Sequence, residues 1–202
     1  MSSKQEKLDA LHKAMSKCKK CALRKGCFQV VPGSGSAQAK IMFIGEAPGG
    51  KEDEIGIPFI GSSGKFLDEM LEIIKLKRDD VYIANIVKCR PPKNRDPRRK
   101  EKEACWPWLI DQIKMIKPKL IVTLGRHSMD LFLPDQKISQ AHGKAMNQEI
   151  KGIGRQTFYT LYHPFAALCN GKIRKDLIKD FKQIPKVIER IKDSTSSSRG
   201  EK

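Results

Sequence analysis

The sequence predicts one α/β domain of three layers, in which helices cover both faces of a central four-stranded parallel sheet. Two observations lead to this prediction. Short apolar runs alternate with helical patterns along the chain, and three of the runs are almost continuously Ile, Val and Leu, as in strands buried on both faces. The predicted strands cover residues 40–45, 81–87, 119–125 and 157–163.

Apolar residues at helical spacing predict helices between and around these strands. One is expected within the first 20 residues, and others cover 64–76, 98–116 and 177–188. Pro107 and Pro185 fall inside the last two patterns and are expected to kink or shorten them. Residues 1–192 are expected to form the domain, and the polar residues 193–202 a disordered tail.

The charge of the chain points to a polyanionic partner. Lys and Arg number 40 against 23 Asp and Glu, which gives a net charge of +17 and a pI near 9.7. Such a surface is typical of nucleic-acid binders, although a lysine-rich proteome would also produce it, and an anionic membrane surface is a weaker alternative. No apolar run approaches the roughly 18 residues of a membrane span, and the N-terminus lacks a signal-peptide core, so a cytoplasmic protein without membrane contact is expected.

The cysteine pattern predicts a metal site. Two thiols form a C-x-x-C pair and two others lie far along the chain, and together they can supply four thiolates: Cys18, Cys21, Cys89 and Cys105. This spacing leaves zinc, iron–sulfur and redox chemistry open, and Cys89 and Cys105 could instead be small buried apolar residues. Cys27 is close enough in sequence to compete as a ligand, whereas Cys169 is expected to pack in the core.

Polar side chains collect where the predicted strands end. Glu46, Asn85, Cys89 and His163 all fall at carboxyl ends, the edge at which open parallel sheets bind their ligands. Asn85 is the most informative of them, because an amide inside an apolar strand must find hydrogen-bond partners. Taken singly, the other residues have ordinary structural explanations, so the prediction of a site depends on their combination.

Five motifs follow one another in order: GEAPGGKED at 45–53, PFIG at 58–61, YIANIVKCRPPKNRDP at 82–97, LG at 124–125 and HP at 163–164. Between about residues 18 and 181 the chain resembles the family 4 uracil-DNA glycosylases, the thermophile-type enzymes that carry a 4Fe–4S cluster. The resemblance implies an enzyme that flips uracil out of single- or double-stranded DNA and hydrolyses its N-glycosidic bond, the first step of base excision repair. A monomer would suit an enzyme that scans DNA.

The same resemblance implies roles for individual residues. The cluster, with a structural role, would be held by the four cysteines Cys18, Cys21, Cys89 and Cys105. The uracil site would include Ala47, with Phe59 stacking on the base and Asn85 matching its O4 and N3–H. Glu52 matches the position that crowds the 5-methyl group of thymine.

Two developing charges determine the expected catalytic residues. His163 would donate to uracil O2 as the leaving base becomes negative. Glu46 would stabilise the cationic sugar or orient the attacking water, with Asp53 as the alternative carboxylate.

Residues 88–102 hold eight basic residues in fifteen and predict a loop that grips DNA phosphates. The residues expected to do so are Lys88, Arg90, Lys93, Arg95, Arg98 and Arg99; the alternative is a solvated charged face. A covalent subgroup of relatives carries a nucleophilic histidine in this loop. Here the loop has no histidine, so hydrolytic turnover is expected.

Two positions depart from the family pattern. His142 stands where an Arg precedes Gly, and Phe165 where Ala follows His-Pro. Two other functions also fit parts of the sequence. A cluster-bearing module could grip DNA or a flipped base without cutting it, and a phosphoester hydrolase could use the glycine-rich loop and carboxylates with a divalent metal.

Overall fold

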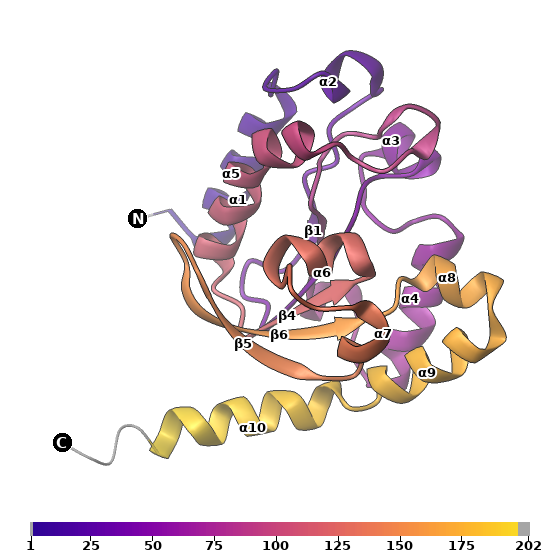
Figure 1. The fold of residues 1–202 in the computed structure, drawn as a ribbon. Coiled ribbons are helices and arrows are strands. Elements are labelled where there is room, and N and C mark those ends of the chain that lie inside the picture. Colours follow the sequence, from indigo (N-terminus) through magenta and orange to yellow (C-terminus); the bar gives the residue numbers. More distant parts are fainter. Residues whose placement is uncertain (1, 198–202) are drawn as a thin grey trace.

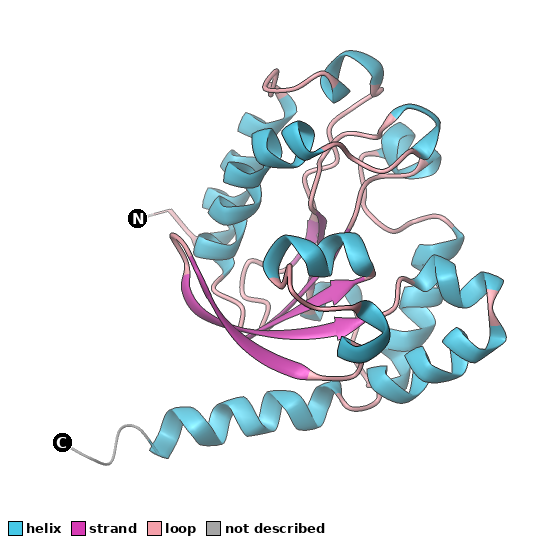
Figure 2. Cartoon of the chain, viewed as in Figure 1, coloured by secondary structure: helices cyan, strands magenta, loops and turns pink. Residues whose placement is uncertain are grey.

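A computed structural model describes residues 2–197, and it shows one twisted sheet between two helical layers (Figures 1 and 2). The sheet has six strands in the order β1-β3-β2-β4-β6-β5. They are β1 (Ser34–Gly35), β2 (Ile41–Gly45), β3 (Tyr82–Asn85), β4 (Leu120–Leu124), β5 (Ala145–Ile150) and β6 (Gly154–Leu161). The four central strands are parallel, which confirms the predicted parallel core of the sheet.

The two edge strands were not predicted. Strand β1 pairs antiparallel with β3 over only two residues, and β5 pairs antiparallel with β6. Strand β5 is mostly exposed and polar, so it lacks the apolar run that marks a buried strand. The sheet is therefore mixed, with antiparallel edges on a parallel centre.

Alternate strand residues face the two helical layers. Met42 and Ile44 pack in the core formed with α1 (Lys4–Ser16), α5 (Arg99–Ile116) and α6 (Arg126–Phe132). Phe43 points to the opposite core, formed with α4 (Ser62–Ile73), α9 (Gly171–Phe181) and α10 (Ile184–Ser197). The remaining helices are short and lie in the connections: α2 (Leu23–Gly26), α3 (Gly50–Ile55), η1 (Arg78–Asp80), η2 (Pro92–Asn94), α7 (Ile138–Ala141) and α8 (Pro164–Cys169). Among the described residues, no helix is both long and apolar enough to span a membrane.

The two prolines act differently from each other. Helix α5 continues through Pro107, and its buried face (Leu109, Ile113) packs on the sheet beyond it. Near Pro185 the chain instead breaks, because α9 ends at Phe181 and α10 begins at Ile184. Pro185 then occupies the first turn of the new helix, where its missing N–H costs nothing.

The predicted boundary of the disordered tail at residue 193 was wrong. Helix α10 extends to Ser197, so 193–197 belong to a helix; residues 198–202 lie outside the described part of the chain.

Candidate active site and cysteine site

The carboxyl ends of the central strands surround a cavity of about 530 Å³. Strand register brings Gly45 beside Asn85, and Leu124 beside Leu161, so residues that follow these positions meet at one edge. The cavity is lined by six of the residues predicted for catalysis or uracil binding, together with the predicted phosphate contact Arg95: Glu46, Ala47, Glu52, Phe59, Asn85 and His163. The topology therefore gathers into one pocket residues separated by more than 100 positions in the sequence.

Asn85 ends β3 and presents an unused hydrogen-bond acceptor. Its side chain is only 2% exposed, and its Oδ1 is buried without a partner among the described residues. Gly45 makes this possible, because a Cβ there would lie 2.5 Å from Asn85 Oδ1 and 2.5 Å from Phe59 Cζ. A buried acceptor without a partner is costly, which indicates that a ligand supplies the missing donor.

Phe59 forms an aromatic wall of the pocket and has a strained backbone. Its φ of 55° is in the left-handed region, unusual for a bulky residue. Its ring centroid lies 5.7 Å from that of His163, with 32° between the planes. Helix α4 approaches so closely that a Cβ on Gly64 would lie 1.7 Å from the Phe59 carbonyl oxygen.

Arg78 holds the Phe59 backbone in this conformation. Its guanidinium donates to the carbonyl oxygens of Phe59 and, at 3.0 Å, of Pro58. Asp68 fixes the guanidinium through an ion pair of 2.6 Å. Because strained residues persist only where their surroundings enforce them, this clamp places the Phe59 ring.

Glu52 anchors the other side of the same loop. Its Oε1 accepts hydrogen bonds from the backbone N–H groups of Ile60, at 3.0 Å, and Gly61, at 2.9 Å. Gly61 precedes α4 and has no side chain with which to cap the helix, and Glu52, from α3, instead holds the two residues that lead into it. Glu52 also lines the pocket, and its contact with a 5-methyl group stays a prediction.

His163 is held as a neutral imidazole with its Nε2–H free. Its Nδ1 accepts the backbone N–H of Phe165 at 3.1 Å, which assigns the ring proton to Nε2. Burial, together with the nearby His127, lowers the pKa of His163 to about 4. Gly125 leaves room for this ring, since a Cβ there would lie 2.9 Å from His163 Cβ. The site therefore contains a fixed neutral donor.

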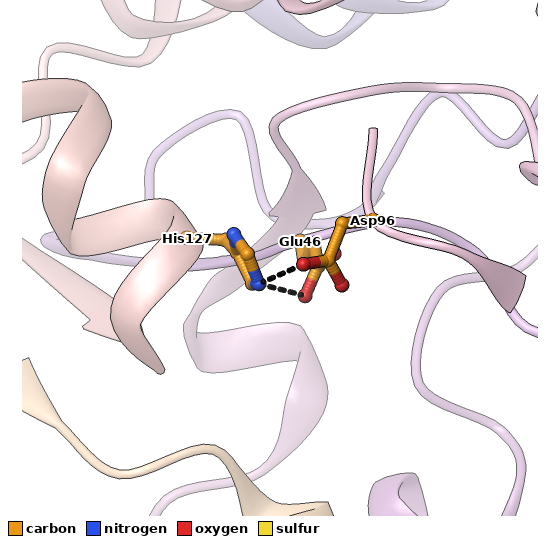
Figure 3. A group of neighbouring side chains, drawn as sticks. All are labelled: Glu46, Asp96 and His127. Atoms are coloured by element: carbon orange, nitrogen blue, oxygen red, sulfur yellow. Dashed lines mark ion pairs between the residues drawn. The ribbon is translucent and has the colours of Figure 1, made fainter. Parts of the chain in front are cut away.

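Glu46 belongs to a trio that the sequence analysis did not assemble (Figure 3). His127 Nε2 lies 3.2 Å from Asp96 Oδ2 and 3.7 Å from Glu46 Oε2. Burial, and then the charge of Asp96, raises the pKa of Glu46 to about 7. His127 comes two residues after Gly125, at the carboxyl end of β4, so the strand-end rule could have found it. Asp96 gave no such signal, because it lies within the basic loop.

The four predicted ligand cysteines line one small cavity: Cys18, Cys21, Cys89 and Cys105. The indole Nε1–H of Trp108 donates to Cys18 Sγ at 3.2 Å. Burial, followed by the neighbouring thiol of Cys27, raises the pKa of the Cys89 thiol. Protons can leave such crowded thiols only if a metal compensates the negative charge, as in a thiolate site.

The spacing of the sulfurs bears on the kind of metal group. Among the described residues, no three cysteine sulfurs lie within 4.8 Å of one another. A tetrahedral zinc–thiolate site, with bonds of about 2.3 Å, would bring its sulfurs to roughly 3.8 Å apart. In this structure the described cysteine sulfurs are therefore spread more widely than they would be around a bound zinc ion. Cys27 lies beside Cys89 but does not line the cavity. The expectation that Cys169 packs in the core was wrong, because it is exposed at the end of α8.

Comparison with known proteins identifies the family. The uracil DNA glycosylase superfamily model matches residues 32–184. A type-4 uracil-DNA glycosylase of Saccharolobus solfataricus is 45% identical over 91% of this chain and 87% of its own length. Those of Sulfurisphaera tokodaii, at 46% over 89% and 84%, and Archaeoglobus fulgidus, at 43% over 89% and 92%, are similarly related. The chain belongs to the type-4 uracil-DNA glycosylase family.

Asp53, predicted as an alternative catalytic carboxylate, does not line the pocket. It is buried in α3, and its carboxylate accepts the backbone N–H groups of Phe28, at 3.0 and 3.1 Å, and Gln29, at 3.4 Å. The expectation of a reserve catalytic carboxylate was therefore wrong in its geometry. Asp53 joins the segment after α2 to the helix that carries Glu52.

The expectation that Lys88 grips a phosphate was also wrong. The side chain is 2% exposed, and its Nζ donates to Asn85 O at 2.9 Å and to Gln112 Oε1 at 2.7 Å. Burial lowers the pKa of Lys88 to about 8, while the Cys105 thiol opposes that shift. The basic composition of residues 88–102 does not show which of their side chains point into the protein.

The rest of the basic loop divides into anchored and exposed residues. Arg95 forms a bidentate pair with the buried carboxylate of Glu101, at 2.9 and 2.6 Å. Arg90 is half-buried and donates to Asn94 Oδ1 at 2.7 Å. The predicted contacts that stay exposed are Lys93, Arg98 and Arg99. These three side chains are available to DNA phosphates.

The two departures from the type-4 pattern lie near the pocket. His142 Nδ1 is 2.6 Å from Asp180 Oδ2, and its ring centroid is 4.5 Å from that of Tyr162, which lines the cavity. Phe165 also lines the cavity, with 59% of the residue exposed. Neither departure replaces Glu46, Asn85 or His163, which line the pocket.

Proposed function

We propose that this chain excises uracil from DNA by hydrolysing the N-glycosidic bond, releasing free uracil and leaving an abasic site. The observation that carries the proposal is the buried, unpartnered Oδ1 of Asn85, between an aromatic wall and a neutral imidazole donor. Uracil supplies the missing donor through N3–H. Cytosine offers an acceptor at N3 and would leave the amide oxygen unpaired.

The clamped ring of Phe59 stacks on the flipped base, and Gly45 keeps open the space between that ring and the amide. An unpaired base is less costly to extrude, and reading it through one fixed edge is how base-flipping enzymes select their targets. The pocket is set before the substrate arrives, because Arg78 and Glu52 fix the loop from both sides. The loop therefore loses little conformational entropy when the base binds.

Bond cleavage makes the sugar cationic and the base anionic. His163 Nε2–H donates to uracil O2 and stabilises the departing anion without transferring its proton. Glu46 faces the sugar as a carboxylate, stabilises the cation and accepts a proton from the water that adds to C1′. A carboxyl group with a pKa of about 7 suits this base, because it is ionised in a large fraction at neutral pH and still basic enough to take the proton.

A 4Fe–4S cluster fits the four converging cysteines, whose sulfurs are spaced more widely than a single ion requires. Cys18, Cys21, Cys89 and Cys105 would hold the cluster, which would cross-link the N-terminal segment, the segment after β3 and helix α5. Cys89 and Cys105 flank the basic loop, so this cross-link would brace it from both ends. No step of the hydrolysis requires the cluster to change oxidation state.

The exposed cations Lys93, Arg98 and Arg99 contact phosphates on either side of the flipped nucleotide. Such contacts position the strand without reading sequence, and they make affinity fall with salt. We expect the chain to act as a monomer on single- or double-stranded uracil-containing DNA.

The trio Glu46, Asp96 and His127 favours one alternative, a phosphoester hydrolase that uses a divalent metal. Arg126 lies 3.3 Å from Asp96 and already supplies the trio with positive charge. Chelation separates the two functions, because hydrolysis at a glycosidic bond by His163 and Glu46 needs no divalent ion.

The test is incubation of anaerobically purified protein with a labelled uracil oligonucleotide in EDTA, followed by alkali and a sizing gel. Strand cleavage at uracil only after alkali supports a glycosylase. Asn85→Ala should abolish turnover, and Asn147→Ala, on the exposed edge strand β5, serves as its control. Cleavage without alkali that EDTA abolishes would favour the phosphoester hydrolase. An intact strand, with protein shown to hold its cluster, would favour a DNA-binding module.

A further inference from the structure

Lys88 is a buried cation without an acidic partner. It lies in the segment that follows β3, and its Nζ donates to two neutral oxygens, Asn85 O and Gln112 Oε1. No carboxylate in the described part of the chain forms an ion pair with it. Because isolated charges are rarely left in protein interiors, a negative group close to Lys88 is to be expected.

The nearby groups that can become negative are thiols. Lys88 lines the same small cavity as the four predicted ligand cysteines and immediately precedes Cys89. Cys105, on helix α5, lines this cavity as well, and its thiol is close enough to the Lys88 side chain for the two to interact electrostatically. Lys88 therefore lies beside the cysteine site as well as beside Asn85.

A buried polar network fixes the direction of the ammonium group. The Nε2 of Gln112 donates to Pro32 O at 2.8 Å and to Tyr82 Oη at 2.6 Å, which turns its Oε1 toward Lys88. The main chain is also fixed, because Val31 N–H donates to Lys88 O at 2.7 Å. These hydrogen bonds hold the ammonium group of Lys88 between Asn85 O and Gln112 Oε1.

We propose that Lys88 is the counter-ion of the thiolate-bound cluster and, through Asn85 O, the positioning residue of the amide that reads uracil. Four thiolates around a cluster leave a net negative charge in a buried place, and Lys88 compensates part of it. The same ammonium group donates to the main chain of Asn85 and so sets where its side chain enters the pocket. The cysteine site and the uracil site are joined by one side chain. This inference rests on the proposed function and on the cluster.

Lys88→Met tests it, since methionine keeps most of the volume and removes the charge and the donor. Lys114→Met, at an exposed position of α5, is the matched control. Iron per chain, the visible absorbance of the cluster and its midpoint potential are measured first, and kcat on a single-stranded uracil oligonucleotide second. We expect Lys88→Met to lower the potential or lose at least half of the iron, and to lower kcat at least tenfold. The control should match the unmodified chain.

Gln112→Glu keeps the inference testable if Lys88→Met does not fold. It gives Lys88 a carboxylate partner and withdraws part of the charge from the cysteines, so the midpoint potential should again fall. Full iron, an unchanged potential and unchanged kcat in Lys88→Met, or an unchanged potential in Gln112→Glu if Lys88→Met does not fold, would overturn the inference. An unmodified chain that does not excise uracil would refute the proposed function instead, and one that excises uracil without bound iron would refute the cluster.

Discussion

Replacing Arg78 by Lys tests whether the clamp on Phe59 positions the base-stacking ring. Arg78 contacts the carbonyl oxygens of Pro58 and Phe59 while Asp68 holds the guanidinium. Lysine can still pair with Asp68, but its single ammonium cannot span two carbonyls and a carboxylate in fixed directions. The substitution therefore keeps the positive charge beside Asp68 and removes the simultaneous hydrogen bonds to the carbonyl oxygens of Pro58 and Phe59.

The expected magnitude follows from two opposing free energies. The left-handed conformation of Phe59 costs on the order of 1–2 kcal/mol, and each lost hydrogen bond to Arg78 contributes about 1 kcal/mol. Because the Arg78 side chain is 27% exposed, water replaces part of what is lost. We therefore expect Arg78→Lys to make the base-stacking conformation of Phe59 less favourable by about 1.4 kcal/mol. If the reaction needs that conformation, this free energy corresponds to roughly a tenfold lower kcat/KM. The melting temperature should fall by no more than about 4 °C, since α4 and the sheet stay packed.

The assay is kcat/KM on a single-stranded uracil oligonucleotide, with affinity for uracil-free DNA measured in parallel. Arg174→Lys is the control, because Arg174 pairs with Glu69 of helix α4 at 3.4 Å and lies over the Phe66 ring, whereas Arg78 is the residue that donates to the carbonyl oxygens of Pro58 and Phe59. Uracil-free DNA should bind both variants as it binds the unmodified chain. If Arg78→Lys keeps full kcat/KM, the clamp does not position Phe59, and the hydrogen bonds to Glu52 together with the packing of Gly64 suffice to hold the loop.

The remaining predictions concern three parts of the molecule: Glu46, Gly45 and the exposed part of the basic loop. With the pKa of Glu46 raised to about 7, kcat/KM should rise with pH and level off above that value; Glu46→Gln should remove this limb. The same raised pKa destabilises the folded chain at pH 8 relative to pH 4, so Glu46→Gln should raise the melting temperature more at pH 8. Gly45→Ala should lower kcat/KM at least 100-fold with a stability loss of about 1–3 kcal/mol, because its methyl meets Asn85 and Phe59 at 2.5 Å. Replacing Lys93 and Arg98 by Ala should weaken binding to all DNA sequences and reduce the salt slope by about one for each residue.

Each of these has a result that would contradict it. A flat pH profile from 5 to 9 would exclude Glu46 as the ionising group of the reaction. Normal turnover in Gly45→Ala would show that the pocket can accommodate a methyl group at this position, despite the two 2.5 Å contacts expected for it. An unchanged salt slope would place the phosphate contacts elsewhere than on the exposed part of the basic loop.

Much of the fold was predictable because its signals are local. A strand buried on both faces must be apolar throughout, and a surface helix must be apolar every third or fourth residue, so the parallel core and the main helices follow from periodicity. The edge strands β1 and β5 lack such patterns, because edges satisfy half of their backbone groups outside the sheet. Proline likewise has two outcomes, and tertiary packing decided between the continuous α5 and the break before α10.

Motif order and residue type are sufficient to predict the family and the position of the site at the strand ends, and the predicted residues Glu46, Phe59, Asn85 and His163 all line the pocket. The direction in which each side chain points depends on residues distant in sequence, so it can be read only from the folded chain.

Lys88, Asp53 and His127 illustrate that limit. Lys88 is the first residue of a basic stretch in which several side chains face solvent, yet it points into the interior, where it binds Gln112 on α5. Asp53 neighbours a pocket residue and turns instead to the backbone after α2. His127 reaches Glu46 because parallel strands end together. Burial and long-range hydrogen bonds set these orientations, and neither is encoded in the spacing of residues along the chain.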